Sequence, residues 1–423
     1  MARPAPDPAR TVERTYLSLT LLTTLASSFI WGINTIFLLD AGLSNVEAFA
    51  ANAFFTAGMV IFEVPTGVVA DTRGRRLSYV LGTMTLVVST LLYLLMWQVH
   101  APFWGWAVAS ALLGLGFTFF SGATEAWLVD ALAATGFRGH LEHVFGRAQS
   151  VGGAAMLIGS LAGGVVAQVT NLGVPYLLRA ALLGLATIVA LRYMVDIGFT
   201  PQRASPVAAI RTVVNGSVEH GFRNPPVRWL MLAGLFTGGT GIYVFYAAQP
   251  YLLELFGDPS AYSIAGLAAA IFAGVQILGG LMVPYARRLF RRRTDALLVS
   301  GIAAVGFLLL LGTTTSFVLA LVLLSAWSLI STVARPMRMA YVNGIIPSSA
   351  RATVLSFDSL MSSAGGVVAQ PVLGRVADIG SYGLSYLIAG AVNVLAIPFL
   401  VLARLERSSS DPIAETDEVA AAA

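Results

Sequence analysis

Two glutamates lie within long apolar stretches of the chain. Ionisable side chains are rare in such stretches, so both are candidates for a chemical function. Glu63 lies in the run 46–70, and Glu125 lies in the run 103–132. Eight residues separate Glu63 from Asp71 at the end of its run, which is about 12 Å of helix rise. A charged side chain inside a bilayer costs about 2.5–3.5 kcal/mol, so each glutamate needs a partner, water or a proton. Both are candidates for proton coupling, and for Glu63 a hydrogen bond between helices is an equal alternative.

Other kinds of chemistry find little support in the residue types. The chain has no cysteine, and all 25 of its basic residues are arginine. A phosphate-binding glycine loop needs a lysine, so this chain has no such nucleotide site. His140 and His143 are three residues apart, but no further metal ligand lies near them in the sequence. We therefore expect no catalytic residue, no metal and no cofactor, and predict that the protein is not an enzyme.

The elements that must position the glutamates are membrane helices. Hydrophobic residues make up 57% of the 423 residues and charged residues only 11%, against about 25% charged in soluble proteins. A helix needs roughly 20 apolar residues to cross a bilayer. Twelve runs meet this need, so we predict an all-α membrane protein with the lipid bilayer around these runs: 15–39, 46–70, 76–98, 103–132, 147–169, 174–195, 227–251, 261–286, 294–313, 316–341, 351–377 and 383–404.

The arginines predict how these helices are oriented. With the N-terminus in the cytoplasm, every basic residue except Arg179 and Arg375 falls on the inner side. This bias is the positive-inside rule, and it predicts a multi-pass protein of the bacterial cytoplasmic (inner) membrane with both termini cytoplasmic. Because the arginines lie in short clusters between apolar runs, we expect no nucleic acid as a partner.

The chain divides into two halves. The predicted parts are a cytoplasmic N-terminal tail (1–14), a six-helix bundle (15–195), a cytoplasmic linker (196–226), a second six-helix bundle (227–404) and a disordered cytoplasmic tail (405–423). Ala162–Gln168 and Ala364–Gln370 have the same sequence, AGGVVAQ, 202 residues apart. A repeat at half the chain length is typical of duplicated transporter bundles. The prediction is therefore two pseudo-symmetric six-helix bundles.

One loop has a specific pattern. Gly67, Asp71, Gly74, Arg75 and Arg76 follow the second run at the spacing of the loop between helices 2 and 3 of the major facilitator superfamily, which this chain resembles over its whole length. Within that superfamily, the segments 63–67 (EVPTG) and 121–130 (SGATEAWLVD) look like the drug:proton antiporter branches. The second-half counterpart, 284–293 (PYARRLFRRR), keeps the basic residues and lacks the aspartate.

The resemblance implies roles for particular residues. By family analogy, a charge network at the inner face gates the transporter, and it would comprise Gly67, Asp71, Gly74, Arg75, Arg76, Asp130 and Arg147. Helices 1, 4, 7 and 10 face the central cavity in the superfamily, which favours Glu125 over Glu63 as the coupling acid. The same analogy predicts these cavity residues: Trp31, Asn34, Phe120, Trp127, Tyr243, Tyr246, Gln249, Trp327 and Arg335.

Together these features predict a secondary active transporter that works by alternating access, as a monomer. We expect proton-coupled efflux of small organic molecules, including drugs, because aromatic walls with few polar groups suit bulky amphipathic substrates. A symporter or facilitator that imports a small metabolite is the alternative on the same fold. A membrane enzyme or receptor is disfavoured, since no catalytic cluster and no long soluble domain is present.

Overall fold

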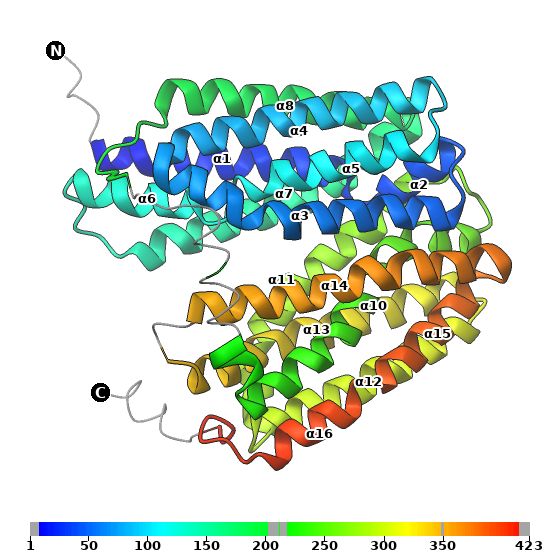
Figure 1. Cartoon of the computed structure of the whole chain (residues 1–423). Helices are drawn as coiled ribbons and strands as arrows, with labels where there is room; N and C mark the ends of the chain where they lie inside the picture. Colours follow the sequence, from blue (N-terminus) through cyan, green and yellow to red (C-terminus); the bar gives the residue numbers. More distant parts are fainter. Residues whose placement is uncertain (1–7, 202–210, 212–217, 348–350, 414–423) are drawn as a thin grey trace. The chain divides into compact units, whose positions relative to one another are not determined.

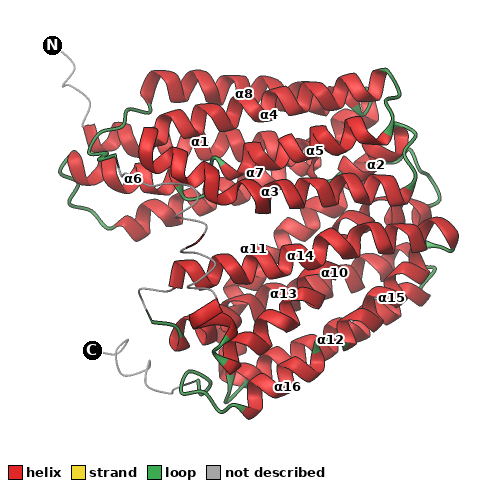
Figure 2. Ribbon diagram, in the orientation of Figure 1, coloured by secondary structure: helices red, strands yellow, loops and turns green. Residues whose placement is uncertain are grey.

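The computed structural model describes residues 8–201, 211, 218–347 and 351–413. Over these residues the chain forms helices joined by loops, with one isolated β-bridge between Arg292 and Pro412 (Figures 1 and 2). The all-α prediction is confirmed. Parts of the predicted tails and linker lie outside the described residues, namely 1–7, 202–210, 212–217 and 414–423.

The chain forms two compact units. Unit 1 comprises Met1–Ile210 and Gly257–Ala273, and unit 2 comprises Arg211–Phe256 and Gly274–Ala423. The helices of the first half are α1 (Pro8–Trp31), α2 (Asn34–Asp40), α3 (Asn45–Arg73), α4 (Arg75–Gln98), α5 (Phe103–Thr118), α6 (Ala123–Ala134), α7 (Leu141–Val169) and α8 (Gly173–Tyr193). Those that follow are the π-helix η1 (Val218–Phe222), α10 (Pro225–Phe256), α11 (Tyr262–Leu289), α12 (Arg293–Thr313), α13 (Phe317–Ile345), α14 (Arg351–Ile379), α15 (Tyr382–Val394) and α16 (Ile397–Leu405).

Among the described residues, ten helical segments are long and apolar enough to span a membrane, with α5–α6 and α15–α16 counted as one segment each, and the bent pair α1 and α2 is an eleventh. The twelfth expected run, 351–377, corresponds to α14, which is 29 residues long but more polar. Three expected spans are interrupted. The first bends by 48° between Trp31 and Asn34, the fourth breaks between α5 and α6, and the last breaks between α15 and α16. In the fourth span, Gly122 takes a left-handed backbone with φ of +67°, which glycine adopts without strain.

The outer faces of the helices are rich in large apolar side chains, and small or polar side chains are buried among apolar ones. Along α4, large apolar side chains recur every three or four residues on the exposed face: Leu77, Leu81, Met84, Val88, Leu91 and Leu95. Its buried face carries Ser78, Tyr79, Gly82, Thr83, Ser89 and Thr90. Since lipid tails are as apolar as leucine, membrane helices associate through small and hydrogen-bonding residues rather than through a hydrophobic core. This pattern fits a protein whose solvent is lipid.

Each copy of the AGGVVAQ repeat lies at a close helix crossing. α7 packs against α1 in unit 1, and α14 packs against α10 in unit 2. A Cβ added to Gly163 would lie 2.7 Å from the carbonyl carbon of Phe29, and one added to Gly365 would lie 2.9 Å from that of Leu235. The repeat therefore marks equivalent crossings in the two units, where only glycine lets the backbones approach.

Local capping follows the sequence. Ser44 and Glu47 form a capping box at the start of α3. Before α11, the carboxylate of Asp258 accepts hydrogen bonds from the backbone nitrogen and the hydroxyl of Ser260, at 2.8 and 2.6 Å. These bonds hold the pKa of Asp258 below its usual value because they stabilise the charged form.

Candidate functional site

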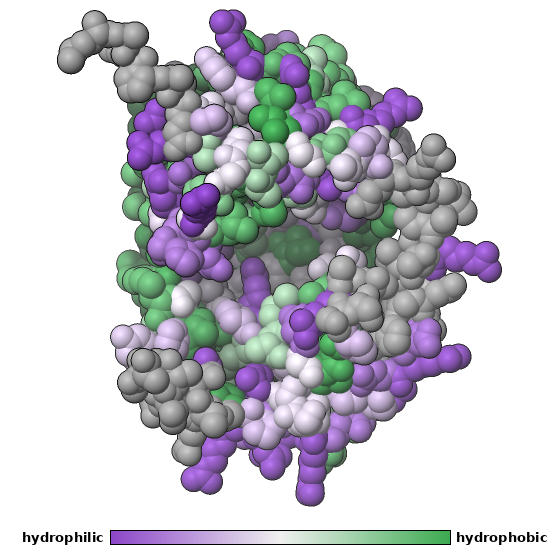
Figure 3. Space-filling view, turned by 90° about the vertical axis from the view of Figure 1, so that its left-hand side faces the viewer, coloured by the Kyte–Doolittle hydropathy of each residue, from purple (hydrophilic) through white to green (hydrophobic). Residues whose placement is uncertain are grey.

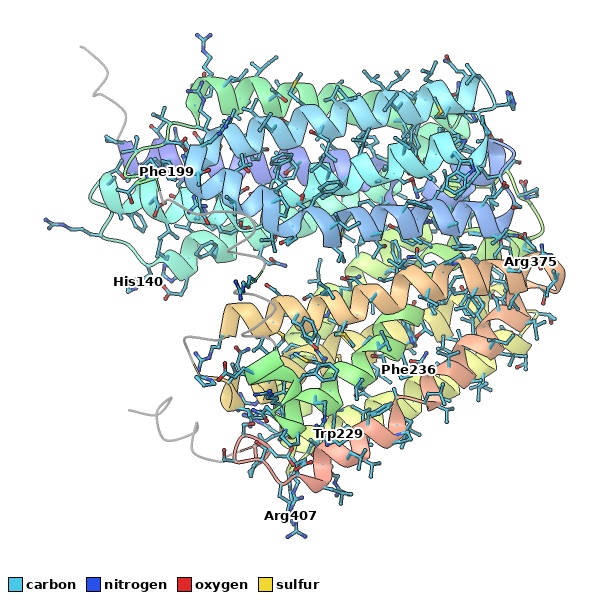
Figure 4. All side chains as sticks on the ribbon, in the orientation of Figure 1. His140, Phe199, Trp229, Phe236, Arg375 and Arg407 are labelled. Atoms are coloured by element: carbon cyan, nitrogen blue, oxygen red, sulfur yellow. The ribbon has the colours of Figure 1, made fainter. Side chains whose placement is uncertain are left out.

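The loop between α3 and α4 carries the predicted motif, and its charges pair locally. Gly74 separates the two helices with φ of +110°. The guanidinium of Arg75 donates to the carboxylate of Asp71 at 2.5 Å, and the Asp71 side chain is 39% exposed. Arg75 also lies over the ring of Phe199, 5.8 Å from its centre. Figure 4 shows Phe199 at the same end of unit 1 as His140. In the space-filling view of this end, hydrophilic side chains lie among apolar ones (Figure 3).

Asp196 belongs to this loop in space, although the sequence pattern did not single it out. It follows α8, and its carboxylate accepts a hydrogen bond from the backbone nitrogen of Arg76 at 3.0 Å. The guanidinium of Arg76 donates to the backbone oxygen of Leu191. In the sequence, the one feature that marks Asp196 is its position three residues after a membrane helix. Acidic residues are common in such loops, so this position alone does not predict a contact with Arg76.

The predicted gating residues are not all brought together. Arg147, at the start of α7, pairs with Glu13 of α1. Asp130 is half-buried near the end of α6, and its backbone oxygen lies beside Gly198. Gly67 has open space around it. Of the predicted charge network, the described contacts thus contain the Asp71–Arg75 pair, and they give Arg147 a partner that the sequence did not suggest.

The two candidate coupling acids lie beside the break in the fourth span, Glu63 on the neighbouring helix α3 and Glu125 at the start of α6. The hydroxyl of Ser121, in the break, donates to the carboxylate of Glu63 on α3 at 2.6 Å. Glu125 lies in the first turn of α6, and both glutamates are exposed. On the other side, the hydroxyl of Ser78 in α4 donates to the backbone oxygen of Phe119 at 2.9 Å. Two exposed carboxylates, one on α3 and one on α6, thus lie next to a break whose Phe119 and Ser121 make hydrogen bonds to other helices.

The predicted cavity residues divide into buried and accessible ones. Asn34 is buried, where it donates to Asn52 and accepts from Tyr176, both at 3.0 Å. Trp127 is buried and donates to the backbone oxygen of Val195 at 2.8 Å. Tyr243 and Gln249 are also buried, and Tyr243 donates to Ser385 at 2.5 Å. The remaining candidates are partly or fully exposed: Trp31, Phe120, Tyr246, Trp327 and Arg335.

Unit 2 contains an ion pair that the sequence reasoning missed. Both guanidinium nitrogens of Arg338 on α13 pair with the carboxylate of Asp358 on α14, one of them at 2.6 Å. The same guanidinium donates to the backbone oxygen of Leu230 on α10 at 3.1 Å. The Asp358 side chain is only 8% exposed. Gly234 leaves room for this pair, since a Cβ there would lie 3.2 Å from Arg338.

Figure 4 labels two arginines of unit 2 that the positive-inside prediction assigns to opposite sides of the membrane. Arg375, one of the two exceptions, lies at the end of the unit opposite Arg407 (Figure 4).

The rings of His140 and His143 lie 5.5 Å apart. Within the described residues, no three His, Asp or Glu side chains gather as a metal site.

Comparisons with known proteins give the family context. Residues 16–334 and 263–422 match the sequence profile of the Major Facilitator Superfamily. An uncharacterized MFS-type transporter of Methanocaldococcus jannaschii is 22% identical over 390 residues, which is 92% of this chain and 96% of the relative.

Solved structures resemble the chain over nearly its whole length. For a mutant of the nucleoside transporter NupG, the TM-score is 0.79 at 13% identity, over 92% of this chain and 99% of that chain. For a POT family transporter in complex with a thioalcohol-conjugated peptide, it is 0.70 at 11% identity, over 93% and 96%. For a D-xylose-proton symporter, it is 0.63 at 16% identity, over 93% and 96%. At these identities the likeness concerns the fold alone.

Proposed function

Because the chain belongs to the Major Facilitator Superfamily, we propose that this membrane transporter exports small organic molecules, including drugs, in exchange for protons. It would work by alternating access as a monomer of the bacterial inner membrane, with both termini cytoplasmic. The two six-helix bundles, 15–195 and 227–404, would be its moving halves. This assignment corresponds to the drug:proton antiporter branches of the superfamily.

The observation that carries the proposal is the exposed carboxylate of Glu125 in the first turn of α6. An acid is electrostatically favoured in the first turn of a helix, which offsets part of the cost of a charge on Glu125 within the span. Exposure lets water or substrate reach it. An ionisable group at such a depth is a functional candidate by default. Glu63 is the second candidate, with Ser121 as its hydrogen-bond donor.

The expected substrates are bulky amphipathic cations. Trp31, Tyr246 and Trp327 are partly exposed aromatic residues on the helices assigned to the cavity. Aromatic faces attract cations and bury large apolar areas, and a glutamate can exchange a bound cation for a proton. The gating network remains part of the proposal, with Asp71–Arg75 as one of its pairs.

The test uses inside-out vesicles, ethidium as the probe, and a pH gradient that can be imposed or collapsed. Glu125→Gln should abolish ethidium transport driven by the pH gradient, because the amide binds no proton. The variant should keep the wild-type elution profile. The control Asp258→Asn changes an exposed loop acid and should transport normally. Full transport by Glu125→Gln would remove this residue from the mechanism, and uptake confined to the opposite vesicle orientation would favour the importer.

A further inference from the structure

The first residues of α4 and α12 receive the same kind of cap from remote segments. Both helices begin after a residue that makes no side-chain capping bond, Gly74 for α4 and Arg292 for α12. In unit 1, Asp196 accepts from the backbone nitrogen of Arg76, the second residue of α4. In unit 2, Asp411 accepts from the backbone nitrogen and the hydroxyl of Thr294, the second residue of α12, both at 2.9 Å.

Each acid follows the last helix of its half. Asp196 lies three residues after α8, and Asp411 lies six residues after α16. In each case an arginine at the start of the capped helix donates to a nearby backbone oxygen, which belongs to the last turn of α8 in unit 1 and to the segment of Asp411 in unit 2. Arg76 donates to Leu191 in unit 1. Arg293 donates to the backbone oxygens of Ser410 and Pro412 in unit 2, at 2.5 and 2.8 Å.

The same segments hold the fourth helix of their half. In unit 1, the indole of Trp127 on α6 donates to Val195, and Gly198 lies against the backbone oxygen of Asp130. In unit 2, the hydroxyl of Ser410 donates to the backbone oxygen of Tyr341 on α13 at 2.9 Å. Residues 194–199 and 408–413 thus join the start of the third helix to the inner part of the fourth. The second segment lies within the tail 405–423 that we expected to be disordered, and Asp411 is only 2% exposed.

We propose that residues 194–199 and 408–413 are equivalent clamps, and that Asp196 and Asp411 are positioning residues for transport. Asp196 matters most for α6, because the break at Gly122 separates α6 from α5 and continuous helix bonds do not hold it. The clamp then fixes the helix that carries Glu125.

The test measures amide hydrogen exchange in the full-length protein in lipid nanodiscs. Asp196→Ala should speed exchange roughly tenfold in residues 123–134 and in the first turn of α4, as expected for a lost helix cap. Asp411→Ala should do the same in the first turn of α12 and the last turn of α13. Each variant should leave the other unit unchanged, so each unit is the control for the other. Asp258→Ala removes another carboxylate that accepts from a backbone nitrogen, and it should change neither region.

The asparagine variants separate capping from charge. Asp196→Asn and Asp411→Asn keep an acceptor oxygen and should exchange within about threefold of wild type. If an alanine variant does not fold, exchange more than about threefold faster in the asparagine variant would show that an acceptor oxygen is not what holds the turn, and would overturn the cap. Unchanged exchange in the capped turns, or equal effects of both alanine variants on both units, would overturn the clamp.

The transport arm rests on the proposed function. In the ethidium assay, Asp196→Ala should lower the maximal rate at least fivefold with KM within about twofold, and Asp196→Asn should restore at least half of it. A wild-type rate in Asp196→Ala would refute the positioning role. Failure of the wild type to move ethidium would count against the proposed export alone, because hydrogen exchange tests the clamp without a substrate.

Discussion

The glycine crossings allow a quantitative prediction from distances. A Cβ on Gly163 would lie 2.7 Å from the carbonyl carbon of Phe29 and 3.0 Å from its Cα, whereas carbon atoms pack at about 3.5–4.0 Å. Both atoms belong to the backbone of α1, so no side-chain rotation relieves the contact. Gly163→Ala must therefore push α1 and α7 apart by nearly 1 Å, and Gly365→Ala must do the same to α10 and α14.

The size of the effect follows from two opposing contributions. Overpacking costs about 1–3 kcal/mol, and we take the upper end because backbone meets backbone. Alanine gains about 1 kcal/mol over glycine in helix propensity. The net loss is about 2 kcal/mol for each variant, or a fall of about 4 °C in melting temperature at roughly 2 °C per kcal/mol.

Matched controls lie on the same units. Gly184 in α8 and Gly306 in α12 have no atom within 4 Å of an added Cβ. Their alanine variants keep only the propensity gain and should melt at or up to about 2 °C above wild type. The assay is differential scanning fluorimetry of all four purified variants in one detergent. If Gly163→Ala or Gly365→Ala melts as high as its control, the close crossing is not a constraint and the reasoning fails.

Three further substitutions probe the charges. Asp358→Ala should cost about 3 kcal/mol of stability, the lower end for a buried ion pair, because Asp358 is 8% exposed but the partner Arg338 is 24% exposed. Asp295→Ala, in a more exposed ion pair, should cost about 1 kcal/mol or less in the same melting assay. Equal losses of stability in Asp358→Ala and Asp295→Ala would show that the cost of breaking an ion pair here does not depend on its burial. Asp71→Asn should cost about 1 kcal/mol, since its pair with Arg75 is only partly buried and the amide keeps an acceptor oxygen. It should nevertheless lower ethidium transport severalfold at normal expression; unchanged transport would refute the gating network.

Much of the local structure could be predicted from the sequence. The all-α fold, the capping box at Ser44 and the loop ending at Gly74 depend on residues close together in the chain. The Asp71–Arg75 pair is also local, being four residues apart. Such features follow from hydropathy, backbone preference and short-range hydrogen bonding, which a single sequence carries.

The interruptions of the spans were not predicted. Hydropathy over 103–132 indicates one helix, because Phe119 and Phe120 are as apolar as their neighbours. The break depends on hydrogen bonds from other helices, such as the one from Ser78 to Phe119. These bonds replace the helix bonds that the break removes. The hydropathy of the sequence does not predict such hydrogen bonds between helices.

The sequence by itself determined that this chain is a membrane protein, how many apolar runs it has and which loop carries the paired charges. Each of these properties depends on residues that are close together in the chain. Only the tertiary structure decided which remote groups meet. Arg147 pairs with Glu13, Arg338 with Asp358, and Asp411 with Thr294. Their separations along the chain run from tens of residues to more than a hundred, and each choice depends on which helices the folded unit packs together.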